Sequence, residues 1–187
     1  MSQDHEFIIA GFGGQGVLFA GLLLAHAGMA TGRNVAWIPS YGPEMRGGTA
    51  NCAVIISEEE VGSPIVTRPT GVIVMNEPSL AKYAPMVRPG GVLVVNSSLV
   101  KSSTDRTDIR VLEIPANEVA FELGNDRGAN MVALGALLAA TEALPMDVVE
   151  DALPETLGAS KARFVASNRE ALRRGAALVT SHPVTIQ

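Results

Sequence analysis

Short apolar runs alternate with longer helical segments through most of the chain. The runs are bounded by glycine, proline and polar residues, and they predict strands at 6–10, 34–39, 51–57, 71–75, 92–96 and 109–114. Helices are predicted between strands at 17–31 and 77–87. Such alternation predicts an α/β fold, a Rossmann-like three-layer sandwich with a mostly parallel sheet and helices on both faces.

After Pro115 the pattern becomes helical only. Helices are predicted at 116–123, 131–144, 146–153 and 161–175, with Pro145 and Gly158 between them. Gly135 lies in the middle of an apolar helix, which indicates close packing against another element. No linker or repeat divides the 187 residues, so we expect a single domain, 1–187, with its core at about 7–175.

Composition and charge narrow the class of protein. Hydrophobic residues make up 47% and charged residues 18%, which predicts an ordered chain. With 4% aromatic residues and a net charge of −5, binding to nucleic acid or to an anionic membrane is not expected. Residues 7–32 carry no charge, but glycines interrupt them, so we expect no membrane span. The acidic amino terminus does not resemble a signal peptide, and we expect a cytoplasmic protein.

The chemical inventory is small. A lone cysteine, Cys52, and three scattered histidines cannot hold a disulfide framework or a cluster with four thiolate ligands. Cys52 is expected to be a small buried hydrophobe. Nucleophile turns, zinc motifs and a phosphate-binding P-loop are absent, so we predict no catalytic residue in this chain.

A glycine-rich motif lies between the first predicted strand and the first predicted helix. Residues 11–16 (GFGGQG) fit the pattern G-x-G-x-x-G. They are Gly11, Phe12, Gly13, Gly14, Gln15 and Gly16. One interpretation is a site for a dinucleotide or phosphate at the helix amino terminus. However, residues 36–40 lack the carboxylate that would hold a ribose. The other interpretation is a turn that packs tightly or receives the backbone of a partner.

Two further places are candidates for function. The polar stretch 40–51 holds Tyr41, Glu44 and Arg46 at a strand end, where open α/β sheets bind ligands or partners. Asn130 is most simply the N-cap of the helix predicted at 131–144. Lys161 and Arg163 are expected to be solvated unless they approach the glycine motif.

Three motifs together carry a family resemblance: residues 11–17 (GFGGQGV), 40–48 (SYGPEMRGG) and 130–135 (NMVALG). With them the chain resembles, from about residue 7 to 175, the gamma subunit of 2-oxoacid:ferredoxin oxidoreductases. That family includes enzymes for pyruvate, 2-oxoglutarate, 2-oxoisovalerate and indolepyruvate. The compact length and the 40–48 loop look most like the 2-oxoglutarate or branched-chain types.

The resemblance implies a non-catalytic subunit of an oxidoreductase that converts a 2-oxoacid to an acyl-CoA and reduces ferredoxin. It implies alpha and beta subunits as partners, with a delta subunit as a further candidate, and it places thiamine diphosphate, magnesium and the iron–sulfur clusters in those partners. Coenzyme A is a candidate shared ligand. The glycine motif, Tyr41, Glu44, Arg46 and Asn130 would then face the partners or the coenzyme. Two alternatives remain open: a stand-alone NAD(P) or flavin oxidoreductase, and a coenzyme A or nucleotide-binding module.

Overall fold

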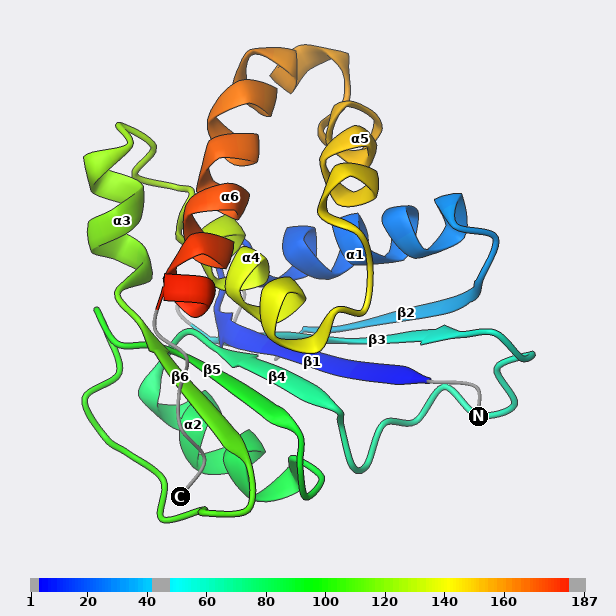
Figure 1. Cartoon of the computed structure of the whole chain (residues 1–187), viewed down its shortest axis with the longest axis vertical. Coiled ribbons are helices and arrows are strands. Elements are labelled where there is room, and N and C mark those ends of the chain that lie inside the picture. Colours follow the sequence, from blue (N-terminus) through cyan, green and yellow to red (C-terminus); the bar gives the residue numbers. More distant parts are fainter. Residues whose placement is uncertain (1–3, 42–47, 182–187) are drawn as a thin grey trace.

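The computed structural model describes residues 4–41 and 48–181, and within them one sheet of six strands forms the centre of the molecule (Figure 1). The strands are β1 (His5–Phe12), β2 (Asn34–Tyr41), β3 (Thr49–Ser57), β4 (Gly71–Val74), β5 (Val92–Asn96) and β6 (Arg110–Ile114). Their order is β2-β3-β1-β4-β5-β6. Only β3 runs antiparallel to its neighbours β1 and β2, so the predicted mostly parallel sheet is confirmed.

Helices cover both faces of this sheet. They are α1 (Val17–Ala30), α2 (Glu77–Tyr83), α3 (Ala116–Glu122), α4 (Ala129–Thr141), α5 (Met146–Leu157) and α6 (Val165–Ser181), with short 3₁₀ helices η1 (Ala84–Met86) and η2 (Ala159–Phe164). In Figure 1, α2 lies on one face and α1 and α4 on the other, while α5 and α6 pack outside α1 and α4. The predicted α/β sandwich with a helical C-terminal part is therefore confirmed.

Successive side chains of β1 point to opposite faces of the sheet, so they pack into two separate hydrophobic cores. Phe7 and Ile9 contact the large core under α1 and α4, whereas Ile8 and Ala10 contact the smaller core over α2. Helix α1 is apolar on almost all sides because the sheet lies on one side of it and α5 on the other. This arrangement explains why residues 17–30 contain no charged side chain.

Helices α4 and α6 approach each other through paired glycines. A Cβ at Gly135 would overlap the carbonyl oxygen of Leu172, and a Cβ at Gly175 would overlap that of Val132. The close packing predicted for Gly135 is thus confirmed. The prediction that the last helix spans 161–175 is wrong at both ends, because η2 precedes it and Gly175 lies inside α6 at this contact.

Helix α5 also continues past its predicted end. It passes through Pro154, whose ring nitrogen cannot donate to the carbonyl oxygen of Glu150. That oxygen instead accepts a hydrogen bond from Arg169 of α6 at 3.5 Å. The Glu150 carboxylate forms two further bonds of 2.7 Å to Arg173, so α5 and α6 are joined at this point.

Among the helices of the described ranges, none combines the length and the apolar character needed to span a bilayer.

Gly135→Ala and Gly175→Ala should each lower the free energy of unfolding by about 1–3 kcal/mol. The added methyl group overlaps a backbone carbonyl oxygen, which cannot move aside as a side chain could. Urea unfolding followed by circular dichroism measures the loss. Gly62→Ala is the matched control, since nothing lies within 4 Å of a Cβ there. Equal stability of all three variants would contradict the close helix contact.

The thiol of Cys52 should be unreactive in the folded protein. Its side chain is fully buried in β3, and burial raises its pKa to about 12. A thiol reagent at pH 8 is therefore expected to modify Cys52 only as fast as the protein unfolds. Modification that is fast in native buffer and independent of added urea would contradict this burial.

Candidate functional site

The glycine motif forms the turn from β1 into α1 at the edge of the sheet where the parallel strands end. Gly14 has φ of 94° and Gly16 has φ of 74°, a region that residues with a Cβ rarely adopt. Gly16 is the N-cap residue of α1, and no side chain that the structure describes caps that helix. The motif therefore presents backbone N–H groups at a helix amino terminus that no described side chain accepts from.

Gln15 fastens this turn to the adjacent strand β4. Its Oε1 accepts a hydrogen bond of 2.6 Å from the backbone N–H of Phe12, and its Nε2 donates one of 3.0 Å to the carbonyl oxygen of Met75. Glycine is needed at position 11, because a Cβ would lie 2.5 Å from Gln15 Oε1 and 2.8 Å from Met75 Cβ. Gln15 is thus a structural anchor whose amide is already satisfied.

Two more hydrogen bonds tie the turn to β3 and α4. The N–H of Gly13 donates to the carbonyl oxygen of Gly48, just before β3, at 3.0 Å. Nδ2 of Asn130 donates to the carbonyl oxygen of Gly16 at 3.0 Å. Asn130 lies in the first turn of α4, whose N-cap is Gly128, so its predicted capping role is wrong. The side chain instead joins two elements that are 114 residues apart in sequence.

Part of the turn stays open to a ligand or partner. Gly13 and Gly14 are exposed, and no atom of the described residues lies within 4 Å of the position of a Cβ on Gly14. No acidic residue lies in the first turn of α1. Asn130 is 6% exposed, and its buried Oδ1 has no hydrogen-bond partner among the described residues. The exposed part of the turn can therefore accept an anionic group at the helix end, whereas the Oδ1 of Asn130 is buried from solvent.

The second predicted motif reaches the same edge. Tyr41 at the end of β2 pairs with Ala50 of β3, so the two strands form a hairpin, and Gly48 just before β3 contacts Gly13 of the glycine turn. Glu44 and Arg46 lie outside the described residues. The structure thus brings the β3 end of this loop to the glycine turn, keeps Tyr41 one strand further away, and leaves the two charged residues as predictions.

The strand order argues against a dinucleotide site. In nicotinamide-binding folds the second strand lies beside the first, and its end holds the ribose. Here β3 lies between β1 and β2, which moves the end of β2 one strand further away from β1, by about 5 Å.

Lys161 and Arg163 are exposed on η2, which packs against α5 and α6, so both side chains are solvated as predicted.

No group of three or more potential metal ligands occurs in the part of the chain that the structure describes. The functional element that sequence reasoning missed is the anchor between Gln15 and Met75. A glutamine inside the motif followed by a buried strand 60 residues later carries no local signal of such pairing.

Gln15→Glu tests the anchor. The variant keeps an oxygen for Phe12 but replaces the donor with a carboxylate oxygen that faces the carbonyl oxygen of Met75. We expect the free energy of unfolding to fall by about 1–3 kcal/mol. Asn168→Asp is the control, since it removes an exposed donor to Phe164 and should cost less than about 0.5 kcal/mol. Equal losses in the two variants would contradict an anchoring role.

Comparison with known proteins gives concordant matches. Residues 6–178 match the profile of the family described as pyruvate ferredoxin/flavodoxin oxidoreductase. Ketoisovalerate oxidoreductase subunit VorA of Methanothermobacter marburgensis is 41% identical over 169 residues, which cover 90% of this chain and 35% of that protein. The chain therefore spans about a third of the length of that relative.

A second relative and a solved structure match over most of their length. The 2-oxoglutarate synthase subunit KorC of the same organism is 35% identical over 159 residues, covering 81% of this chain and 86% of the relative. The crystal structure of the gamma subunit of a keto/oxoacid ferredoxin oxidoreductase from Geobacter sulfurreducens superposes with a TM-score of 0.83 at 29% identity, covering 96% of this chain and 98% of the other. With a glycine turn tied to three elements and a profile match that spans nearly all its residues, the chain belongs to the pyruvate ferredoxin/flavodoxin oxidoreductase family.

Proposed function

We propose that this chain is the gamma subunit of a heteromeric 2-oxoacid:ferredoxin oxidoreductase of the cytoplasm. The complex oxidatively decarboxylates a 2-oxoacid, forms an acyl-CoA and passes the electrons to ferredoxin. The observation that carries the proposal is the end-to-end match to a gamma subunit of this enzyme class, in which neither chain has a large unmatched part. The profile match over residues 6–178 supports it independently.

In this proposal the partner subunits, alpha and beta with or without delta, carry thiamine diphosphate, magnesium and the iron–sulfur clusters. The one cysteine of this chain, Cys52, is poorly suited to ligate a cluster, because its thiol is buried and its pKa is raised to about 12. The role of the chain is then to build the complex around its glycine turn.

The substrate we propose is 2-oxoglutarate or a branched-chain 2-oxoacid. Relatives named for both substrates match this chain at 41% and 35% identity. Because the described residues of this chain hold no reactive group at the glycine turn, the choice between the two acids is assigned to the partner subunits.

Co-expression with the subunits encoded beside this chain tests the assignment. The complete complex is expected to reduce ferredoxin with 2-oxoacid and coenzyme A, with a higher kcat/KM for 2-oxoglutarate or a branched-chain acid than for pyruvate. Omission of this chain should abolish most of that activity, and the chain alone should have none. If the other subunits are fully active without it, the assignment is wrong.

We further propose that coenzyme A passes the glycine turn. The support is the amino terminus of α1, which no described side chain caps, and the exposed backbone of Gly13 and Gly14, which together suit a phosphate group.

Gly14→Asp and Gly14→Asn test whether coenzyme A passes the glycine turn. Both variants add a side chain of the same shape at the same backbone conformation, and they differ only in charge. In the assembled enzyme the KM for coenzyme A should be at least about tenfold higher with Asp than with Asn, because the carboxylate repels phosphates near the helix end. Equal KM values would indicate that the turn contacts protein instead of the coenzyme.

A further inference from the structure

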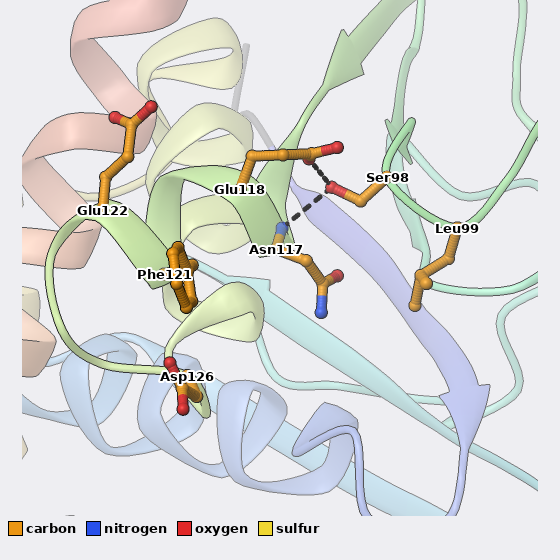
Figure 2. A pocket seen from close by; sticks show the side chains of 7 residues that line it. All are labelled: Ser98, Leu99, Asn117, Glu118, Phe121, Glu122 and Asp126. Atoms are coloured by element: carbon orange, nitrogen blue, oxygen red, sulfur yellow. Dashed lines mark hydrogen bonds between the residues drawn. The ribbon is translucent and has the colours of Figure 1, made fainter.

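A hollow lies at the same end of the parallel strands as the glycine turn, between α3 and the segment that follows β5. Its volume is about 550 Å³, and Figure 2 shows the side chains that line it: Ser98, Leu99, Asn117, Glu118, Phe121, Glu122 and Asp126. The segment that contains Asp126 leads into α4, whose Asn130 holds the glycine turn. The hollow, here called the α3 pocket, therefore lies at the same end of the parallel strands as the candidate site.

The α3 pocket exposes two large apolar side chains. Phe121 is 74% exposed and Leu99 is 47% exposed, and Figure 2 shows them on opposite sides of the hollow with Asn117 between them. Phenylalanine is a side chain that normally contributes to a core or an interface. Here the ring of Phe121 contributes to neither hydrophobic core.

Carboxylates give the α3 pocket a negative charge. Glu118 accepts a hydrogen bond from Ser98 Oγ, which also accepts one of 3.0 Å from the backbone N–H of Asn117. The bond from Ser98 lowers the pKa of Glu118, so this carboxylate is charged at neutral pH. Neither Glu118 nor Asp126 forms an ion pair with any residue that the structure describes.

Cations lie near these carboxylates: Arg127 follows Asp126 in the chain, and the charge of Lys101 contributes to the lowered pKa of Glu118. Lys101 donates its Nζ to the carbonyl oxygen of Ser97 at 2.6 Å. Arg174 of α6 lies 3.5 Å from the carboxylate of Glu122. No cation that the structure describes lies within ion-pair distance of Glu118 or Asp126, so their carboxylate oxygens remain available to an incoming group. They disfavour a phosphate-bearing ligand such as coenzyme A in this pocket.

We propose that the α3 pocket receives an arginine side chain carried by an adjoining subunit of the oxidoreductase. A guanidinium group can stack on the ring of Phe121 while it donates to Glu118 or Asp126, which lysine cannot do as well. Arginine and aromatic residues are also enriched where subunit interfaces are strongest. The inference rests on the proposed function, because it assumes assembly with partner subunits.

A charge-neutral double variant tests the proposal in the complex. Glu118→Gln with Asp126→Asn preserves the shape of both side chains, and the new glutamine amide can still accept from Ser98. We expect its affinity for the co-expressed alpha and beta subunits to fall by at least about tenfold at low salt, with a weaker salt dependence than the wild-type chain shows. The matched control is Glu59→Gln with Glu60→Gln, which makes the same charge change just beyond β3 at the opposite edge of the sheet.

The possible results distinguish the arginine contact from the proposed function of the chain. Wild-type affinity and salt dependence in the double variant would overturn the arginine contact and leave the proposed function in place. Failure of the wild-type chain to bind the other subunits would overturn both. An equal loss in the control variant would show a general charge effect and would also overturn the specific contact.

A labelling experiment reports on the same surface without a charge change. Phe121→Cys places a reactive thiol in the pocket, and the buried Cys52 contributes no background. A maleimide should label the introduced thiol rapidly in the isolated chain and at least about tenfold more slowly in the complex. Unchanged labelling on assembly would overturn the proposal.

Discussion

The turn between β1 and α1 is held from three directions, and the rest of the carboxyl edge is arranged around it. Gln15 donates to the carbonyl oxygen of Met75, which follows β4 on one side of the turn. On the other side, Gly13 donates to the carbonyl oxygen of Gly48, just before β3. Asn130 of α4 donates to the carbonyl oxygen of Gly16. These bonds fix the direction in which α1 begins. A helix end with a fixed direction can offer its N–H groups to a ligand or a partner without first losing conformational freedom.

The pattern of apolar residues was sufficient to predict the elements of the fold. Strand β5 has the predicted bounds, 92–96, because a buried parallel strand is a continuous apolar run between turn residues. The direction of β3 was not predicted, although a signal was present. Only residues 42–48 join β2 to β3, and a parallel crossover needs about a dozen residues or more. The pairing of the two strands as a hairpin follows from that length.

The candidate site was predictable only where the chemistry is local. Positive φ angles at Gly14 and Gly16 agree with the glycine motif, because such a turn is encoded by adjacent residues. The role of Asn130 was misassigned for the opposite reason. A capping residue is identified from its immediate neighbours, whereas this side chain is directed by a carbonyl oxygen of a distant segment. The acidic pocket beside α3 also depends on residues from separate segments and left no motif in the sequence.

The late position of α4 in the chain has a consequence for biosynthesis. One face of β4 and β5 is covered by α4, and α4 is covered in turn by α6, which ends at Ser181. Strands that have already left the ribosome therefore wait for the carboxyl-terminal helices, for roughly 5–20 s at ordinary rates of translation. During that interval the aliphatic side chains of Ile73 and Val94 lack the helical cover that they have in the folded protein.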